Sequence, residues 1–488
     1  MDTSRPAAAE PRVRPLCVDL DGTLVATDTV WEAMLQLLRH KPWRAWQLPV
    51  LAVGGRARLK CWLTGHVRLD AATLPYRPSV LAFLHEQKQL GRPLILATGA
   101  DAAFARDVAD HLKLFDDVVG TQAGCNCTGR GKCQAIAAAL GPEAVFDYIG
   151  DSRADLPVWT SAERAYMVNP TPGVRRRVEA AGRVERVFTE PGAGNRFAAL
   201  LVSMRPHQWV KNALLAVPML VGQQLGDPLK WWALLAAIVC FSLATSAIYL
   251  VNDLFDLAAD RQHPTKRRRP LAAGTLPIPW AVAAVPVLLL MAVGAAAALL
   301  PMQFAALVAG YVVLALAYSG AVKGKAILDV LWLAGLYTLR LVAGGVAVAV
   351  LPSPWLLAFA MFAFLSLAFA KRYAELVRIE HQHGTAAAGR DYHVTDLSLI
   401  GTVGPVAGYM SVLVFALYIT SDDVQQLYPQ YNALWLICPL LIYWLTRLWL
   451  KAHRRVLRED PVMFALTDPA TYGVMGLIAL VALVAAWH

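Results

Sequence analysis

The chain has 488 residues, of which 57% are hydrophobic, and its mean hydropathy is +0.45. A soluble protein of this size does not need so much apolar surface, so we expect most of it to face lipid. The net charge of +10 would also suit nucleic-acid binding, but the positive residues gather in the connections between apolar segments. This placement favours a membrane protein without a nucleic-acid partner.

Two regions differ in composition. Residues 1–196 are mixed and charged, whereas long Ala, Leu and Val segments dominate residues 197–488. We expect a soluble N-terminal domain followed by an all-α polytopic membrane domain. The stretch 171–196, with an arginine run and a Pro-Gly-Ala-Gly turn, is interpreted as the end of the first domain and a linker. No secretory signal is expected, because residues 1–15 are polar and rich in proline.

Within the N-terminal domain, four segments place polar residues at the ends of apolar strands or in nearby turns. They are Asp19-Leu-Asp21-Gly22-Thr23, Thr98-Gly99, Gly131-Lys132 and Gly150-Asp151-Ser152-Arg153-Ala154-Asp155. Strands that end in polar residues, with helical patterns between them, predict a parallel α/β sheet whose site lies at the carboxyl ends of the strands. Any single segment also fits an ordinary strand and turn, but the order of the four favours a functional site.

The four segments, in this order, resemble the motifs of the haloacid-dehalogenase (HAD) superfamily of phosphatases. The resemblance implies that Asp19 is the nucleophile and is converted to an aspartyl phosphate. Asp21 would protonate the leaving oxygen and then activate water. Thr98 and Lys132 would stabilise the phosphoryl oxygens. The presence of Asp21 favours a phosphatase over a dehalogenase.

The same resemblance implies a magnesium site and a cap. Asp19, Asp21 and Asp151 would bind Mg²⁺, with Asp155 behind them. The insert 27–76 would form a small helical cap. Its tryptophans are interpreted as core or membrane-facing residues, in preference to ligands of a cofactor.

The second region contains about nine predicted membrane spans. Their approximate ranges are 208–225, 231–254, 278–298, 302–319, 326–350, 354–371, 400–420, 431–450 and 471–487. The connections after every second span carry Lys and Arg, whereas the alternate connections carry almost none. By the positive-inside rule, the N-terminal domain and the positive connections face the cytoplasm, and the C-terminus lies outside. We therefore expect a multi-pass protein of the cell inner (cytoplasmic) membrane with its active sites on the cytoplasmic side.

A row of carboxylates ends the apolar run 231–251. It consists of Asn252, Asp253, Asp256 and Asp260. On a helix the three aspartates share one face. Carboxylates beside hydrocarbon are costly and usually functional, and such a row suits Mg²⁺ that holds a polyphosphate at the membrane surface. The basic run 261–269 that follows would bind phosphates directly, or else is an ordinary positive cytoplasmic loop.

The carboxylate row and its surroundings resemble the UbiA superfamily of intramembrane prenyltransferases, which bind a diphosphate through Mg²⁺ at aspartate-rich helix ends. The usual members carry a second Asp-x-x-x-Asp motif that helps to bind a prenyl diphosphate. Here Asp329 is followed by Leu333 in place of the second aspartate. This difference argues against an ordinary prenyl-diphosphate substrate.

One branch of the superfamily, the decaprenyl-phosphate phosphoribosyltransferases, is similar over the whole membrane region. The similarity is carried by polar clusters at predicted cytoplasmic helix ends, which are 205–212, 263–274, 371–375 and 460–466. It implies that phosphoribosyl diphosphate and a polyprenyl phosphate are the substrates. Mg²⁺ on the carboxylate row would bridge the pyrophosphate. The pyrophosphate would leave ribose C1 through an oxocarbenium-like state while the lipid phosphate attacks the opposite face.

Several side chains are candidates for holding these substrates. Lys266, Arg267 and Arg269 would bind the ribose 5-phosphate or the lipid phosphate. Further candidates at other helix ends are Lys211, Tyr318, Lys323, Lys371 and Arg372. Asp329 and Arg340 would orient the sugar or the metal, although a structural pairing of Arg340 with Asp329 or another acid is an equal alternative.

Two phosphate-handling domains on one side of the membrane suggest consecutive steps. The membrane domain would make polyprenyl-phosphoryl-5-phosphoribose, and the phosphatase domain would remove its 5-phosphate. The main alternative is a prenyltransferase that attaches an isoprenoid to an aromatic or other small acceptor. A regulatory or scaffolding N-terminal domain, and a phosphatase merely anchored to the membrane, are further alternatives. The sequence indicates neither the length of the lipid nor the oligomeric state.

Overall fold

The computed structural model describes residues 14–122, 126–190, 194–382, 384–387, 390–457, 461–465 and 467–486. Asp460, the first residue of the last polar cluster, lies outside these ranges. The chain forms two compact units, of which the first consists of residues 1–205 and 249–285 and the second of residues 206–248 and 286–488. The carboxylate row and the basic run therefore belong to the same unit as the N-terminal sheet domain.

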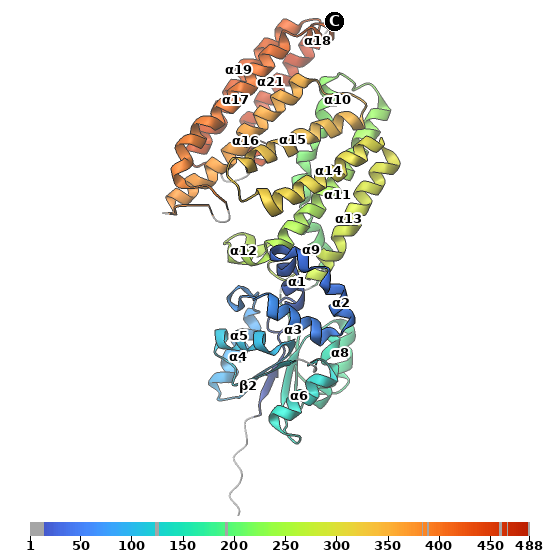
Figure 1. The fold of residues 1–488 in the computed structure, drawn as a ribbon, viewed down its shortest axis with the longest axis vertical. Coiled ribbons are helices and arrows are strands. Elements are labelled where there is room, and N and C mark those ends of the chain that lie inside the picture. The colour runs from blue at the N-terminus through green and yellow to red at the C-terminus, as the bar shows by residue number, and fades with distance from the viewer. Residues whose placement is uncertain are drawn as a thin grey trace, which may run out of the picture. The chain divides into compact units, whose positions relative to one another are not determined.

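The described part of the first unit contains a parallel sheet of six strands (Figure 1). The strands are β1 (Leu16–Val18), β2 (Leu94–Asp101), β3 (Asp117–Thr121), β4 (Asp147–Gly150), β5 (Ala165–Val168) and β6 (Val184–Phe188). Their order is β3-β2-β1-β4-β5-β6, and every neighbouring pair is parallel. The order changes direction between β1 and β4, and ligands of such sheets bind at the carboxyl ends beside that point. The predicted α/β class is confirmed.

Helices cover both faces of this sheet. They are α4 (Pro78–Gln89), α5 (Ala102–Leu112), α6 (Arg130–Leu140), α7 (Leu156–Ser161) and α8 (Pro172–Glu179). Leu16 and Val18 of β1 belong to one core with α4 and α5, while Cys17 between them belongs to a second core with α6, α7 and α8. Because both faces are buried, the inner strands β1 and β5 are apolar throughout, whereas the edge strand β6 carries exposed Glu185 and Arg186.

A helical insert separates β1 from β2. It comprises α1 (Thr29–His40), η1 (Pro42–Arg44), α2 (Gln47–Val53), α3 (Arg56–His66) and η2 (Ala71–Thr73). Asp28 starts α1, because its side chain accepts hydrogen bonds from the backbone N–H groups of Val30 and Trp31. Buried Leu37 and Leu63 pack α1 against α3. The insert is the small helical cap that the motif resemblance implies.

Among the described residues, eight helices are long and apolar enough to cross a membrane. They are α11 (Pro228–Phe255), α13 (Ile278–Leu299), α14 (Met302–Ala317) continued by the π-helical turn η6 (Tyr318–Val322), α15 (Leu328–Ala347), α16 (Pro354–His381), η7 (Val394–Asp396) with α17 (Leu397–Ile419), η8 (Tyr431–Leu436) with α19 (Ile437–His453), and α21 (Pro469–Ala486). Shorter helices of this region are α9 (Arg196–Ser203), α12 (Leu257–Gln262), η5 (Lys266–Arg268), α18 (Asp422–Leu427) and α20 (Pro461–Ala465). The chain is a multi-pass membrane protein with an all-α domain.

The first of the approximately nine expected spans, 208–225, does not form a long helix. It consists of the 3-10 helix η4 (Pro206–Ala216) and the short helix α10 (Val217–Val221). Pro218 stands in the first turn of α10, where its missing N–H group needs no partner, so it suits the start of a new helix. The difference between nine expected spans and eight long helices therefore lies in this segment.

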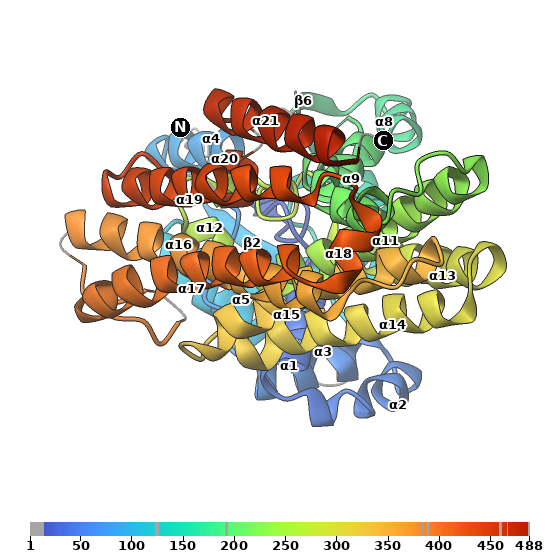
Figure 2. The same cartoon turned by 90° about the horizontal axis from the view of Figure 1, so that it is seen from above.

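Small residues bring the helices of the second unit close together. Figure 2 shows α16, α17 and α19 lying side by side. A Cβ added at Gly404 of α17 would lie 2.2 Å from the ring of Trp449 in α19. Ser366 of α16 joins the three helices, since it donates a hydrogen bond to the Gly404 carbonyl at 2.7 Å and accepts one from Trp449 Nε1 at 3.1 Å. Such contacts are typical of helices that pack within membranes.

We predict that Gly404→Ala destabilises the helical domain, because the added methyl group overlaps the Trp449 ring. Overpacking of this kind costs about 1–3 kcal/mol. Gly335→Ala is the matched control, since a Cβ at Gly335 of α15 meets nothing within 4 Å. Thermal unfolding of the detergent-solubilised protein should show a lower midpoint for Gly404→Ala than for the control. Equal midpoints would contradict the proposed close contact.

Candidate active sites

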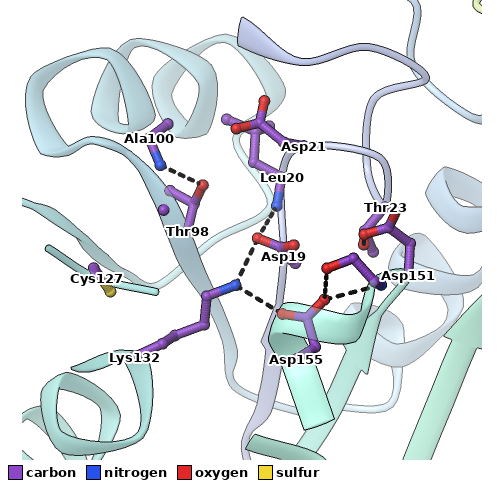
Figure 3. A network of polar contacts seen from close by, with 12 residues as sticks. Asp19, Leu20, Asp21, Thr23, Thr98, Ala100, Cys127, Lys132, Asp151 and Asp155 are labelled. Atoms are coloured by element: carbon purple, nitrogen blue, oxygen red, sulfur yellow. Dashed lines mark hydrogen bonds and ion pairs between the residues drawn. The ribbon is translucent and has the colours of Figure 1, made fainter. Parts of the chain in front are cut away.

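The carboxyl ends of β1, β2 and β4 carry the polar residues that the sequence singles out in the N-terminal domain (Figure 3). Asp19 follows β1 directly, Thr98 lies in β2, and Asp151 follows β4. Lys132 comes from α6, and Asp155 ends the 3-10 turn after β4. The fold thus brings all five residues to one edge of the sheet.

Lys132 is the centre of a buried ion-pair cluster. Its Nζ lies 2.9 Å from Asp19 Oδ1 and 3.1 Å from Asp155 Oδ1, and it donates a hydrogen bond to the Tyr148 hydroxyl at 2.8 Å. The three charged side chains are at most 8% exposed, so their charges must be compensated within the cluster. Burial alone lowers the pKa of Lys132, but the two carboxylates raise that pKa above its ordinary value. Lys132 therefore stays charged at neutral pH.

Three carboxylates of this cluster are placed to hold a metal ion. One oxygen each of Asp19, Asp151 and Asp155 lies within 4.8 Å of the others. Burial raises the pKa of Asp19 to about 6, although Lys132 opposes this shift. Burial and the charges of Asp19 and Asp155 raise the pKa of Asp151 well above its ordinary value. These acids repel one another although Arg77 and Lys132 oppose the shift at Asp151, so a divalent cation would relieve the repulsion, and this donor set fits Mg²⁺.

Asp21, expected both as an acid–base group and as a metal ligand, faces the cap. Its carboxylate accepts hydrogen bonds from Thr29 N at 2.9 Å and from Thr29 Oγ1 at 3.2 Å. Figure 3 shows this carboxylate pointing away from that of Asp19. Burial, followed by the charge of Asp28, raises the pKa of Asp21 to about 7. Asp21 is thus suited to bind or release a proton near neutral pH. In the group of three carboxylates that could hold a metal, Asp155 stands where Asp21 was expected.

Gly22 and two cations complete the surroundings of this site. Gly22 has φ +78, and a Cβ there would lie 2.2 Å from Asp151 Oδ2, so only glycine fits. Lys60 of α3 donates a hydrogen bond to the Gly99 carbonyl at 2.6 Å, and Arg77 Nε donates one to the Gly22 carbonyl at 3.0 Å. Sequence reasoning did not identify Lys60 and Arg77, because cap and turn residues reach the site only after folding.

The carboxylate row lies where α11 ends. Asn252 and Asp253 are in α11, Asp256 lies at the break before α12, and Asp260 is in α12. Backbone hydrogen bonds from Asp256 N to Asn252 O (2.9 Å) and from Asp260 N to Asp256 O (2.8 Å) carry the helical pattern across the break. Arg269 Nη1 lies 3.2 Å from Asp253 Oδ1 and 2.5 Å from Asp260 Oδ2. One arginine therefore joins these two carboxylates on the same face.

Two further arginines neutralise the row. Arg205 donates a hydrogen bond to buried Asp253. Its φ of +54 is in the left-handed region, which non-glycine residues rarely adopt, and such strain is concentrated at functional sites. Arg39 of the cap helix α1 lies 3.7 Å from Asp256 Oδ1. Sequence reasoning did not single out Arg205 and Arg39 as partners of these aspartates, although Arg205 begins the first polar cluster of the membrane region.

The three candidate cations of the basic run have different surroundings. Arg269 contacts the carboxylate row, and Lys266 Nζ lies 4.0 Å from Asp260 Oδ1. The side chain of Arg267 is exposed and lines the same cavity as Asp19. The basic run is therefore shared between the row and the phosphatase-like site.

Asp329, at the start of α15, is fully buried and neutralised by two arginines. Arg372 Nε lies 2.7 Å from Asp329 Oδ2, and Arg390 Nη1 lies 3.4 Å from the same oxygen. The Tyr392 hydroxyl donates a hydrogen bond to Asp329 Oδ1 at 2.6 Å. Arg372 also pairs with Glu375 at 2.8 Å. Two arginines and two acids therefore balance each other in this buried cluster.

The cluster around Asp329 contains residues that the sequence singled out as candidates and residues that it did not. Arg372 Nη2 donates a hydrogen bond to the Tyr318 hydroxyl at 3.3 Å, which brings two candidate substrate residues together. Arg390 and Tyr392 lie in the connection between α16 and α17 and were not among the candidates. In the sequence, Arg390 was noted only as part of a positively charged connection, which predicted the topology and not a site.

Arg340 and Lys211 form a second polar group in the second unit. Arg340 Nε donates a hydrogen bond to Asn212 Oδ1 at 3.2 Å, and Nη2 donates one to the Tyr311 hydroxyl at 2.7 Å. Arg340 and Lys211 both lie over the Tyr337 ring, at 5.1 and 5.9 Å from its centroid. Arg340 is 5% exposed, and none of the carboxylates that the structure describes pairs with it. The alternative that it pairs with Asp329 does not hold.

Two other candidate lysines belong to the second unit, one at a helix end and one inside a helix. Lys323 follows η6, and Lys371 lies in α16 next to Arg372. Both are half-buried. Their positions near predicted membrane boundaries suit either phosphate binding or a topological role.

A multi-pass helical domain joined to a parallel sheet with an acid cluster at its carboxyl edge defines a membrane-bound enzyme with two parts. Residues 214–467 match the UbiA prenyltransferase family, and residues 55–159 match the haloacid dehalogenase-like hydrolases. The chain therefore belongs to the UbiA prenyltransferase family and carries a haloacid dehalogenase-like domain, so it has a transferase part and a hydrolase part.

Curated relatives share this organisation in whole or in part. The chain is 36% identical over 471 residues to the uncharacterized protein y4nM of Sinorhizobium fredii, and the match covers 96% of this chain and 90% of that protein. It is 35% identical over 273 residues to the nodulation protein NoeC of Azorhizobium caulinodans, covering 56% of this chain and 88% of NoeC. It is 38% identical over 231 residues to the decaprenyl-phosphate phosphoribosyltransferase of Mycobacterium tuberculosis, covering 46% of this chain and 75% of that enzyme.

We predict that Gly22→Ala abolishes hydrolysis of p-nitrophenyl phosphate by the N-terminal domain, because the methyl group would displace the Asp151 carboxylate. Gly182→Ala is the control: Gly182 also has a positive φ, +69, but a Cβ there meets nothing within 4 Å. Both variants carry the same kind of backbone strain, roughly 1–2 kcal/mol. Steady-state phosphatase assays should show loss of activity in Gly22→Ala alone. A similar loss in both variants would mean that strain, and not the position of Asp151, limits activity.

Proposed function

We propose that the membrane domain transfers 5-phosphoribose from phosphoribosyl diphosphate to a polyprenyl phosphate, and that the N-terminal domain then removes the 5-phosphate to give polyprenyl-phosphoryl-ribose. The observation that carries this proposal is the missing second acid at the start of α15. Leu333 stands four residues after Asp329, and Asp329 itself contacts Arg372 and Arg390, so this helix end lacks the pair of carboxylates that would help to bind a prenyl diphosphate through a metal. The relative named decaprenyl-phosphate phosphoribosyltransferase, 38% identical over 231 residues, supports the same choice of substrates.

The transfer would be a substitution at C1 of the ribose. The bond from C1 to the pyrophosphate breaks, the pyrophosphate leaves with the electron pair, and an oxygen of the lipid phosphate forms the new bond to C1. The lipid phosphate is already an anion and needs no general base. Asn252, Asp253, Asp256 and Asp260 would hold Mg²⁺, which stabilises the charge of a leaving pyrophosphate when it is bound.

Fixed cations of the protein would hold the phosphate groups. Arg205 and Arg269, which contact Asp253, would bind oxygens of the diphosphate beside the metal. Arg340 is buried without a carboxylate partner among the described residues, and a phosphate group would compensate its charge. Positioning and charge neutralisation would supply most of the acceleration.

The N-terminal domain would hydrolyse the 5-phosphate in two steps. Asp19 attacks phosphorus, the bond from phosphorus to the ribose oxygen breaks, and Asp21 gives that oxygen a proton. Asp21 then takes a proton from the water that releases phosphate from Asp19. For this work Asp21 has to turn from Thr29 towards Asp19, so proton transfer depends on the cap helix. Lys132 would hold the phosphoryl oxygens, and Asp19, Asp151 and Asp155 would hold Mg²⁺.

One assay tests the coupled scheme. Purified protein with phosphoribosyl diphosphate, polyprenyl phosphate and Mg²⁺ should release pyrophosphate and form polyprenyl-phosphoryl-ribose, identified by mass spectrometry. Asp256→Asn should slow pyrophosphate release, because it weakens the metal site. Asp19→Asn should accumulate the 5-phosphorylated lipid, since loss of a nucleophile slows catalysis by about 1,000-fold or more.

Two outcomes would contradict the scheme. If wild type and Asp19→Asn both yield only the 5-phosphorylated lipid, the phosphatase domain does not act on the product. If pyrophosphate is released from a prenyl diphosphate with a small aromatic acceptor, and not from phosphoribosyl diphosphate, the membrane domain is an ordinary prenyltransferase.

The charge pattern supports an orientation in the inner membrane. We infer that the N-terminal domain and the positive connections face the cytoplasm. Single cysteines at Arg268 and at Asp422, introduced into a variant without its exposed native cysteines, test this orientation. A membrane-impermeant thiol reagent that reaches only the outer side should label the cysteine at 422 and spare the one at 268. The reverse pattern would invert the topology.

A further inference from the structure

The phosphatase-like site opens into a cavity of about 1350 Å³ that is lined by two distant parts of the sequence. One side is formed by the catalytic candidates Asp19, Asp21 and Asp151 and by the cap. The other includes Arg267 and residues 271–280, which follow the carboxylate row. All of these residues belong to the first unit. The cavity is larger than the roughly 300–1,000 Å³ usual for small-molecule sites.

A buried ion pair holds this second wall against the cap. Arg261 of α12 pairs with Glu32 of α1 through two hydrogen bonds, Nη2 to Oε1 at 2.6 Å and Nη1 to Oε2 at 3.0 Å. Both side chains are at most 8% exposed. Arg261 also donates hydrogen bonds to the carbonyls of Thr73 at 3.4 Å and Ala272 at 3.2 Å. A bidentate pair of this kind fixes orientation as well as distance.

Gly274 brings the wall into direct contact with the cap. It has φ +73, and a Cβ there would lie 2.2 Å from the carbonyl oxygen of Ala26, which precedes the cap helices. The loop is closed internally by a hydrogen bond from Leu276 N to the Pro270 carbonyl at 3.0 Å. Residues 271–280 are therefore an ordered part of the cavity.

The lining of the cavity has two chemical characters. Three cations, Arg56, Arg196 and Arg267, have exposed side chains along it, and no ion pair joins any of them to a described carboxylate. Apolar side chains, among them Trp31 and Trp280, also line it. Free cations suit a second phosphate, and an apolar border suits a lipid chain.

We propose that Arg267 and residues 271–280 form part of the phosphatase substrate site, and that this site takes a lipid-linked phosphosugar. The terminal phosphate of the sugar binds at Asp19, and the phosphodiester between sugar and lipid binds at Arg267. This assignment rests on the proposed function and deepens it. Arg267, which the sequence suggests as a substrate-binding residue of the transferase, would then belong to the hydrolase site.

Binding of the lipid phosphodiester at Arg267 would allow the phosphatase to select the product over the donor. Phosphoribosyl diphosphate, the proposed donor, also carries a 5-phosphate, and an indiscriminate phosphatase beside the transferase would destroy it. A site that needs the lipid phosphodiester and an apolar border hydrolyses the product and spares the donor. Discrimination comes from contacts that the free sugar phosphate cannot make.

The test compares Arg267→Ala with Arg268→Ala in the full-length protein. Arg268 is a matched control, because it is the adjacent arginine, is also exposed and does not line the cavity. Phosphate release is measured from 5-phosphoribosyl polyprenyl phosphate in detergent micelles and from ribose 5-phosphate. The ratio of the two kcat/KM values should fall about 10- to 100-fold in Arg267→Ala and stay within about twofold of wild type in Arg268→Ala.

Each other result is decisive. An unchanged ratio in Arg267→Ala, or an equal fall in both variants, overturns the assignment. Loss of pyrophosphate release in Arg267→Ala with an unchanged ratio also overturns it and returns Arg267 to the transferase. Failure of the proposed function would be distinguishable, because the wild-type protein itself would then not hydrolyse the lipid-linked substrate.

Discussion

Carboxylate groups that leave water must be neutralised close by, and this constraint organises both units of the chain. The pairs are Asp19 with Lys132, Asp253 with Arg205 and Arg269, Asp329 with Arg372 and Arg390, and Asp468 with Arg447 and Lys451. Removing one partner from such a pair costs roughly 3–5 kcal/mol, because the other charge stays buried. The pairs therefore fix the strand and helix ends that carry them, and both candidate sites stand at such ends.

The balance of positive and negative side chains differs among these clusters. At Asp468 the hydrogen bond from Arg447 holds the pKa of the carboxyl well below its usual range, and no further ligand is needed. At Asp19 three acids lie close together beside Lys132, and a divalent cation would relieve their repulsion. Arg340 has the opposite imbalance, a buried cation without a described acid, which suits an anion. The acid cluster at Asp19 thus suits a metal ion, and the buried guanidinium of Arg340 suits a phosphate group.

How much could be predicted from the sequence depends on how local the signal is. The apolar strand 16–18 and the aspartate that follows it are adjacent in the chain, so the parallel sheet and its polar edge were predictable. The partners of Asp329 were not, because Arg390 lies 61 residues away in a connection whose charge indicated only topology. Hydropathy also does not separate the first expected span, 208–225, from a long helix, although this segment forms a 3-10 helix followed by the short helix α10 with Pro218.

The Glu32–Arg261 pair has a consequence for how the two parts of the chain depend on each other. Its partners are 229 residues apart, one in the cap and one immediately after the last aspartate of the row. Arg261 belongs to the part of the chain that matches the transferase family, and it holds the cap of the hydrolase domain through two hydrogen bonds. The hydrolase domain therefore uses residues of the transferase sequence to orient its cap.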